Sequence, residues 1–339
     1  FFNFKTNNQL NIMRTLYLFT FLFCTTLGFA QTNASDPFAE TIESEDLRQL
    51  LYVYASDFFQ GRETGTLGQK RAVTFLKEFY ETRGIKAGAG SEDYFQKMTL
   101  NIRDKEVKTE NVIAIIEGSE KPDEYLVLSS HLDHIGIRKG LINNGADDDG
   151  SGTVSLLEIA EAFQKAVEAG NGPKRSVIFL HVTGEEKGLL GSKYYTDNPL
   201  YPLANTIANL NIDMVGRTDP KRVNDNLNYI YLIGSDRLST ELHELSEEVN
   251  KATVNIDLDY TFNAHDDKNR FYFRSDHYNF AKNNIPVIFY FNGTHADYHR
   301  PTDTVEKIEF DLMETRARLI FATAWELANR EERIKLIEE

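Results

Sequence analysis

The sequence predicts an α/β protein, in the form of a three-layer α/β/α sandwich whose mixed sheet has a parallel centre. Two observations predict this class. Short apolar segments alternate with helical segments along most of the chain, and acidic and imidazole side chains follow directly after several of the apolar segments. The chain has 339 residues, of which 41% are hydrophobic, and this is enough material for a large core.

The order of apolar and polar residues predicts the individual elements. Two N-terminal helices flank a glycine-rich turn; they are expected at residues 41–56 and 68–82. Strands are expected at 111–117, 125–131, 176–182, 206–215, 229–234 and 286–291. Further helices are expected at 152–169, 240–252, 271–284 and 311–330. We therefore divide the chain into a leader (1–30), an N-terminal helical extension (31–108) packed on the main domain, and one α/β domain (109–339).

The first thirty residues have the pattern of a secretory signal peptide. Met13 and Arg14 lead into an apolar run that begins at Leu16 and closes on small residues at Gly28 and Ala30. The run is shorter than the roughly 20 apolar residues that a membrane-spanning helix needs. We expect cleavage near Ala30 and export to the periplasm or the medium, with no stable membrane insertion afterwards. The residues before Met13 are interpreted as translated upstream sequence.

The cysteine content and the net charge limit which metal ligands, anchors and partners the chain can have. Cys24 is the only cysteine and lies in the segment that would be removed, so the mature chain would have no thiol and any metal would bind to His, Asp or Glu. A lipid anchor at Cys24 is disfavoured because the bulky Phe23 precedes it. The net charge of −15 argues against nucleic acid as a partner.

Acidic and imidazole side chains fall at the ends of three expected strands. His131 and Asp133 follow one strand, Glu185 and Glu186 follow the next, and Asp213 follows the third. In open α/β sheets ligands bind at the carboxyl ends of the strands, so these groups should converge. Taken singly, each could be a surface residue or a charge favoured by a helix dipole. Together the carboxylates would repel one another unless a cation lay among them, which favours a metal site.

These residues, in their order, resemble the zinc-dependent aminopeptidases of peptidase family M28. The resemblance rests on five motifs: His-x-Asp at 131–133, Gly-Ala-Asp-Asp-Asp-Gly-Ser-Gly at 145–152, Glu-Glu at 185–186, Asn-Ile-Asp at 211–213 and Tyr-His-x-x-x-Asp-Thr at 298–304. It covers roughly residues 111–330 and implies a catalytic domain with the fold of zinc-dependent exopeptidases, acting on peptides. The chain has no room for the protease-associated insertion that many exported relatives carry before the first metal strand.

The resemblance also implies a centre of two zinc ions bridged by Asp148. One ion would be completed by Glu186 and His299, and the other by His131 and Asp213. Each ion would then have three protein ligands and share a water molecule, an arrangement that leaves the site open for catalysis.

Three further residues receive catalytic roles from the resemblance. Glu185 would act as general base, taking a proton from the water and delivering it to the leaving amine. Asp133 would accept a hydrogen bond from His131 and so fix the tautomer of that imidazole. Tyr298 would steady the tetrahedral oxyanion.

The remaining polar groups are assigned to structure. The ligand set is complete without the other histidines. Five of these are expected to pack or to line the substrate pocket, namely His134, His181, His265, His277 and His295. The loop at 265–267 is expected to be solvated rather than to bind another ion. The peptide bond between Asp148 and Asp149 is expected to be cis, as in relatives.

Other functions remain as alternatives. A glutaminyl cyclase-like acyltransferase of the same fold would hold a single zinc, and a binding or receptor domain would have lost its ligands or its base. This chain retains all of these groups, which disfavours both. Aminopeptidase is preferred to carboxypeptidase or dipeptidase because it is the commonest activity among relatives. The sequence leaves the residue preference and the oligomeric state open.

Overall fold

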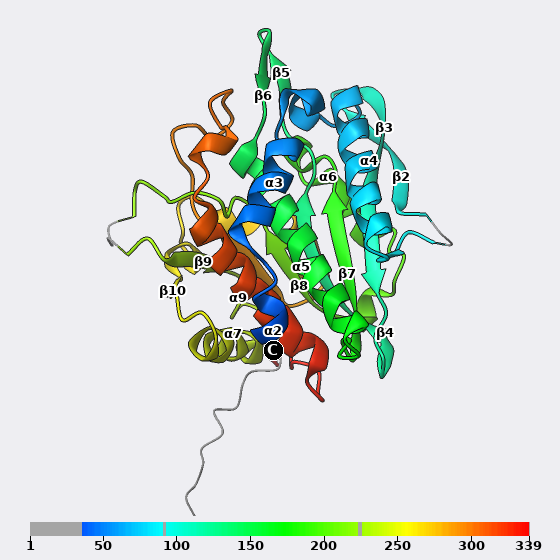
Figure 1. Ribbon diagram of the computed structural model, residues 1–339, viewed down its shortest axis with the longest axis vertical. Coiled ribbons are helices and arrows are strands. Elements are labelled where there is room, and N and C mark those ends of the chain that lie inside the picture. The colour runs from blue at the N-terminus through cyan, green and yellow to red at the C-terminus, as the bar shows by residue number, and fades with distance from the viewer. Residues whose placement is uncertain (1–35, 91–92, 223–225, 339) are drawn as a thin grey trace, which may run out of the picture. The chain divides into compact units, whose positions relative to one another are not determined.

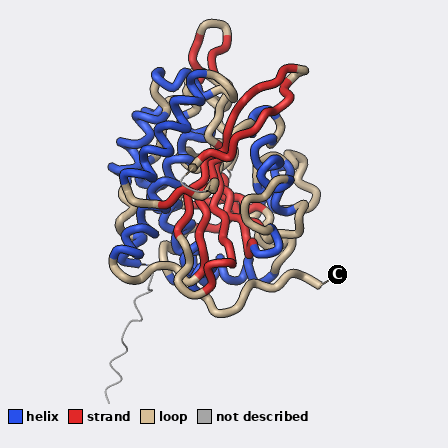
Figure 2. The backbone as a smooth tube through the Cα atoms, turned by 90° about the vertical axis from the view of Figure 1, so that its right-hand side faces the viewer, coloured by secondary structure: helices blue, strands red, loops and turns tan. Residues whose placement is uncertain are grey.

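The computed structural model describes residues 36–90, 93–222 and 226–338. Within these residues a nine-stranded sheet runs between two groups of helices, as Figures 1 and 2 show. The predicted three-layer α/β/α sandwich is therefore confirmed. The predicted signal peptide, residues 1–30, lies outside the described residues.

The sheet has a parallel centre and mixed edges. Its strands are β1 (Lys86–Ala87), β2 (Phe95–Ile102), β3 (Lys105–Ile116), β4 (Lys121–His131), β7 (Arg175–Val182), β8 (Thr206–Ile212), β9 (Tyr229–Ile233), β10 (Asp257–Asp259) and β11 (Val287–Phe291). They lie in the order β1, β3, β7, β4, β8, β11, β9, β10, with β2 paired to β3. Strand β4 is parallel to both of its neighbours, β7 and β8, and β8 is parallel to β11. Their carboxyl ends therefore meet at one end of the sheet.

One face of the sheet carries most of the helices (Figure 1). They are α2 (Asp36–Ala39), α3 (Ser44–Tyr54), α4 (Leu67–Thr82), α5 (Gly152–Glu168), α7 (Thr240–Ala252) and α9 (Phe310–Asn329). Apolar residues of α5 recur at helical spacing, and Leu156, Ile159 and Phe163 are fully buried in the main core. Phe163 packs against Phe321 of α9, with ring centroids 4.9 Å apart. Burial of these apolar stripes attaches the helices to the sheet.

The other face is covered by two shorter helices, α6 (Leu190–Asp197) and α8 (His277–Ala281). Tyr195 of α6 and Phe280 of α8 join a second core cluster with Val127 and Leu180 of the sheet. In the described part of the chain, no helix is both long and apolar enough to span a bilayer.

Two predicted segments differ from the structure. Residues 95–108, which we placed in the helical extension, form β2, a turn and the start of β3. The reason is that side chains alternate between buried and exposed along β2, as in a strand with one face in the core; Gln96, Met98 and Leu100 are buried. The helix predicted at 271–284 contains only a 3₁₀ turn, η6 (Phe271–Phe273), and α8. It is interrupted because the side chains of Ser275 and Asp276 bond to Asp213 and Ser192 in other elements.

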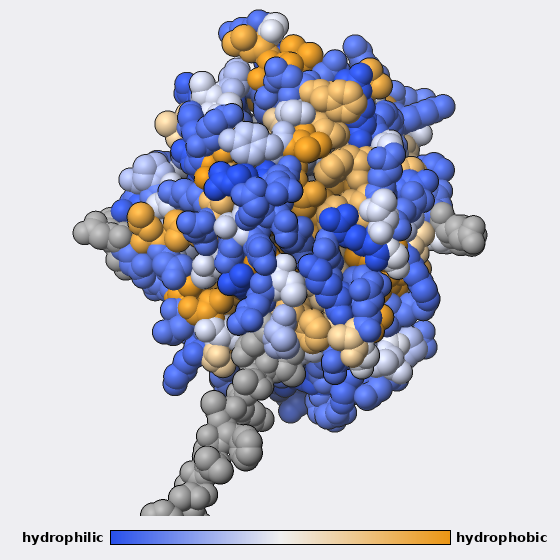
Figure 3. All heavy atoms as spheres, viewed as in Figure 1, coloured by the Kyte–Doolittle hydropathy of each residue, from blue (hydrophilic) through white to orange (hydrophobic). Residues whose placement is uncertain are grey.

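Several exposed apolar side chains lie toward the end of the unit where the short hairpin of β5 (Gly136–Arg138) and β6 (Leu141–Asn143) projects, in contact with η1 (Asp57–Arg62). Figure 3 shows this face as mostly hydrophilic, with apolar atoms gathered near that hairpin. Phe58, Ile137 and Leu141 are among the most exposed large apolar residues described. Single exposed apolar residues are ordinary on protein surfaces.

Candidate metal centre

The predicted site residues all lie at the carboxyl end of the parallel strands. His131 is the last residue of β4, Glu185 and Glu186 begin the 3₁₀ turn η3 (Glu185–Lys187) after β7, and Asp213 directly follows β8. Asp148 lies in the turn η2 (Ala146–Ser151) that precedes α5, and His299 lies in the loop after β11. The site therefore occupies the crevice in which open α/β sheets bind ligands.

Asp148 lies at the centre of the site, between two imidazoles. Its Oδ1 is 3.1 Å from Nε2 of His131, and its Oδ2 is 3.0 Å from Nε2 of His299. Nε2 of His131 is also 3.6 Å from Oδ1 of Asp213. Nε2 of His299 is also 3.1 Å from Oε2 of Glu186. The structure thus brings together the five side chains that the sequence nominated as ligands.

The two aspartates that flank the central one have structural partners instead. Asp149 accepts hydrogen bonds from the backbone amides of His131 at 3.0 Å and of Met214 at 3.2 Å. Asp147 accepts one from the amide of Gly216 at 2.7 Å. Both are fully buried. One carboxylate therefore faces the site while its neighbours fix the segments that supply the other candidate ligands.

Two supporting residues were not identified from the sequence. Asp303 accepts a hydrogen bond from the amide of Asp148 at 3.2 Å, and Ser275 donates one to Oδ2 of Asp213 at 2.7 Å. Asp303 lies in the last of the five motifs, but the partners of both residues are more than 60 residues away in the sequence. The peptide bond between Asp148 and Asp149 is cis, as predicted.

Glu185 lies beside the imidazole of His131, with Oε2 4.0 Å from Nε2. Its backbone amide donates to Oδ1 of Asp133 at 3.1 Å, and Thr64 donates to the other oxygen of that carboxylate at 2.8 Å. Nδ1 of His131 contacts the main-chain oxygen of Asp133 at 3.0 Å, so the expected contact exists but does not use the carboxylate. Burial raises the pKa of Glu185 well above its usual range, and nearby carboxylates add to this while His131 opposes it.

Tyr298 stacks on His299, with ring centroids 3.9 Å apart. It lines the same small pocket as His131, Asp148, Glu185 and Asp213. Burial, followed by the neighbouring carboxylates, raises the pKa of Tyr298 far above its usual range. Its phenol is therefore a neutral hydrogen-bond donor at the edge of the site.

Most of the remaining histidines have partners outside the site. His181 contacts Tyr80 and Ser130, His277 contacts the carbonyl of Tyr272, His295 contacts Asp147, and the exposed His265 contacts Arg237. His134 differs, because its Nδ1 is 2.8 Å from Oε1 of Glu186.

The residues of this site fit a bound cation. Oδ2 of Asp148 and Oε1 of Glu186 are buried without a well-aligned hydrogen-bond partner in the described residues, a costly state for a carboxylate. Burial lowers the pKa of His299, but its contacts with these carboxylates raise it to about 10. The site thus favours positive charge.

Two groups of side chains could each hold a metal ion, because the ligand atoms within each group all lie within 4.8 Å of one another. Asp148 belongs to both groups; one adds His131 and Asp213, and the other adds His134 and Glu186. Imidazole nitrogens and carboxylate oxygens are typical zinc ligands.

Arg62 connects the N-terminal segment to the loops of the site. Its fully buried guanidinium donates to the carbonyls of Leu132 at 3.2 Å, Asn144 at 2.6 Å and Gly145 at 2.9 Å. The first carbonyl follows His131 directly, and the other two precede the aspartate triplet. This arginine therefore holds two of the segments that supply metal-site residues.

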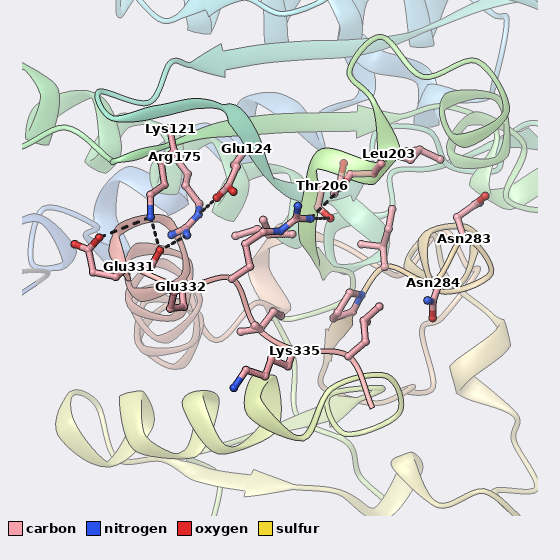
Figure 4. Close-up of a pocket in the computed structure, with 17 residues that line it drawn as sticks. Lys121, Glu124, Arg175, Leu203, Thr206, Asn283, Asn284, Glu331, Glu332 and Lys335 are labelled. Carbon is pink, nitrogen blue, oxygen red and sulfur yellow. Dashed lines mark hydrogen bonds and ion pairs between the residues drawn. The ribbon is translucent and has the colours of Figure 1, made fainter. Parts of the chain in front are cut away.

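A larger cavity of about 860 Å³ lies at the opposite end of the parallel strands, as Figure 4 shows. It is lined by the starts of β4 and β7 and by residues 331–336. Its cations already have partners: Arg175 bonds to Glu124, and Lys121 to Glu331. Size alone does not make it a site, and the convergent titratable groups are at the other end.

Solved structures with the same fold include the LapA aminopeptidase of Legionella pneumophila, at a TM-score of 0.69 and 20% identity, with 88% of this chain and 75% of that one covered. The glutaminyl cyclase of Porphyromonas gingivalis is also similar, at a TM-score of 0.68 and 18% identity, with 84% of this chain and 98% of that one covered. At these identities the likeness shows the fold.

Sequence comparison gives the family. The chain is 31% identical over 225 residues to leucine aminopeptidase 1 of Pyrenophora tritici-repentis, and the match covers 64% of this chain and 55% of that protein. The chain thus spans about half the length of this curated relative. The family model described as peptidase family M28 matches residues 111–324, which is more than half of the chain. On this evidence, the chain belongs to peptidase family M28.

Proposed function

We propose that this chain is an exported zinc metallopeptidase that uses two zinc ions to remove N-terminal residues from peptides. The observation that carries the proposal is the position of Asp148, whose two oxygens face His131 and His299 on opposite sides. A carboxylate so placed suits a bridge between two metal ions. The likeness to a leucine aminopeptidase favours action at the N-terminus. Export is inferred from residues 1–30 alone.

The ligands divide into two sets around the bridge. His131 and Asp213 would hold one ion, and Glu186 and His299 the other, with Asp148 common to both. When bound, zinc would polarise the scissile carbonyl and make a nearby water molecule more acidic. Three carboxylates among the ligands suit two divalent cations, because they offset most of the added charge.

Glu185 is suited to the role of general base. Its carboxylate lies in the pocket but is not needed to hold an ion in this scheme. It would accept a proton from water at Oε2 as the water oxygen bonds to the carbonyl carbon. It would then pass that proton to the nitrogen of the leaving amine as the carbon–nitrogen bond breaks. The raised pKa that burial gives it brings the acid closer to the range useful for such transfer.

Two neighbours would assist this base. Asp133 holds the amide of Glu185 and is itself held by Thr64, so the base has a fixed position. Tyr298 would donate its hydroxyl to the oxyanion that forms at the carbonyl oxygen. Its place on the pocket wall is compatible with this role.

The test combines metal analysis with an aminoacyl-anilide assay. We expect two zinc equivalents, hydrolysis that a chelator abolishes and zinc restores, and loss of turnover in Glu185→Gln with the zinc content unchanged. Glu106→Gln is the matched control, because Glu106 is an exposed residue of the β2–β3 hairpin. A protein that folds but binds no zinc would refute the peptidase proposal.

The rival activities are assayed with the same preparation. Substrates with a blocked N-terminus and a free C-terminus report carboxypeptidase action, and a dipeptide series reports dipeptidase action. The fold shared with a glutaminyl cyclase calls for a further assay of ring closure on N-terminal glutaminyl peptides. Cyclisation faster than hydrolysis, with one zinc per chain, would replace the proposed function by acyl transfer.

A further inference from the structure

His134 lies three residues beyond β4 and faces the metal centre from inside the protein. It is fully buried, with Nδ1 2.8 Å from Oε1 of Glu186 and 3.7 Å from Oδ2 of Asp148. Both ring nitrogens, and both of these carboxylate oxygens, lack a well-aligned hydrogen-bond partner in the described residues. Three of these buried atoms, Nδ1 of His134, Oε1 of Glu186 and Oδ2 of Asp148, thus lie together without such partners.

Simple packing does not account for this imidazole. A buried polar atom without a hydrogen bond is costly, and native proteins rarely keep one. The other buried histidines away from the centre follow that rule, because His181, His277 and His295 each have at least one ring nitrogen close to a protein partner. His134 is buried just as deeply, but its nearest partners are the two carboxylates themselves.

The spacing of the atoms suits a shared cation. Zinc ligands lie about 2.0–2.2 Å from the ion, so ligand atoms around one ion are roughly 3 to 4 Å apart. Nδ1 of His134 is 2.8 Å from Oε1 of Glu186 and 3.7 Å from Oδ2 of Asp148. Nε2 of His299 is 3.0 Å from the same oxygen of Asp148 and 3.1 Å from the other oxygen of Glu186, so this carboxylate faces both imidazoles. The two rings lie 5.7 Å apart, inclined at 68°. This end of the site therefore offers two imidazoles, while the other offers His131.

The backbone around His134 makes a fitted space for its ring. Gly145 has a φ of +54°, and a side chain there would place its Cβ 2.6 Å from ring carbons of His134. The amide of His134 also faces the carbonyl of Arg62 at 3.4 Å. The ring thus packs closely against the backbone at Gly145.

We propose that His134 is a further metal ligand, so that one ion of the pair is held by Asp148, Glu186, His134 and His299. This inference rests on the proposed function, because it assumes that the centre binds metal. It makes the two positions unequal: the ion beside Glu186 has one more protein ligand than the ion beside Asp213 and should be released more slowly and bound more tightly.

The first experiment needs no variant. X-ray absorption fine structure at the zinc edge counts the imidazoles bound to protein loaded with two zinc equivalents. We expect three imidazoles for two ions. Two imidazoles for two ions would overturn the assignment of His134 as a ligand and leave the proposed function intact.

The second experiment compares His134→Asn with wild type. Asparagine places an amide near the position of Nδ1, so it keeps a hydrogen-bond donor for Glu186 but is a poor zinc ligand. Metal-free protein is titrated with zinc in competition with a chromophoric chelator, and cobalt(II) replaces zinc for absorption spectra. We expect the tighter of two sites to weaken by roughly 10- to 100-fold, the range known for residues that support a metal site, with a changed cobalt spectrum.

Two controls distinguish the loss of a metal ligand from an unspecific effect of the substitution and from misfolding. His265→Asn makes the same change at an exposed histidine and should alter neither affinity nor spectrum. Circular dichroism of the metal-free variants checks that each folds. If His134→Asn binds both zinc ions as tightly as wild type, with the same cobalt spectrum, His134 is not a ligand. If wild type itself binds no metal, the proposed function fails as well.

Discussion

Replacing Arg62 by glutamine tests whether the N-terminal segment holds the loops of the metal centre. Arg62 donates from three different nitrogens to the carbonyls of Leu132, Asn144 and Gly145. The shorter, neutral glutamine cannot reach all three. The substitution therefore removes the link between η1 and two loops that carry predicted ligands, without altering any ligand.

The loss of stability depends on which hydrogen-bond donors each of the three carbonyls keeps after the substitution. The carbonyl of Asn144 keeps no other donor in the described part of the chain but is only partly buried, so its loss is at the lower end of the range for a buried acceptor, about 1 kcal/mol. The carbonyls of Leu132 and Gly145 keep second donors, from Tyr54 and Gly150, so each loses about 0.5–1.5 kcal/mol. The sum is a loss of about 2–4 kcal/mol in the free energy of unfolding.

Urea unfolding of the metal-free protein, followed by circular dichroism, measures this loss. Competition titration with a chelator then shows whether zinc affinity falls as well, as expected if the freed loops no longer hold the ligands in place. Arg103→Gln is the control, because it removes the same charge from an exposed turn and should change stability by less than about 0.5 kcal/mol. A cost below about 1 kcal/mol for Arg62→Gln, with zinc affinity unchanged, would refute the reasoning.

Three further predictions concern single contacts. Ser275→Ala removes the donor to Asp213 and should weaken zinc binding by roughly 10- to 100-fold in a chelator titration; unchanged affinity would contradict the supporting role. Thr64→Val frees the carboxylate of Asp133, which holds the proposed general base, Glu185, and should lower kcat while zinc content, measured by atomic absorption, stays the same. Burial raises the pKa of Glu158 to about 8, so the folded state binds a proton that the unfolded state has released above its ordinary pKa of 4.5. The stabilising contribution of this proton is fully present below pH 4.5 and is lost as the pH rises through about 8. In urea unfolding, Glu158→Gln should therefore gain stability relative to wild type from pH 5 to pH 8.5. A difference in unfolding free energy between the two proteins that does not change with pH would exclude the effect.

Much of the fold was predictable because it depends on local pattern. Strict alternation of apolar and polar residues, or a short unbroken apolar run, predicts a strand. Apolar residues spaced three and four apart predict a helix. The central strands and α5, α7 and α9 follow these rules and were found within a few residues of their observed bounds. The hairpin at 95–108 was missed although its alternation is visible, and the helix at 271–284 is interrupted by side chains whose partners are distant in the sequence.

The candidate ligands were also predictable, for a topological reason. Residues that follow parallel strands must meet at one end of the sheet, whatever their separation along the chain. This rule predicts that His131, Glu186 and Asp213 converge, whereas Asp148 and His299 were nominated by the resemblance to family M28.

Only the tertiary structure decided how the remaining polar groups divide the work. Three consecutive aspartates look alike in sequence, but packing turns Asp148 into the site and its neighbours toward backbone amides. Packing likewise brings Arg62 to the loops of the site and leaves His134 buried against Glu186. The direction in which a side chain points, and the partner it finds, depend on segments that come together only on folding, so no local pattern carries that information.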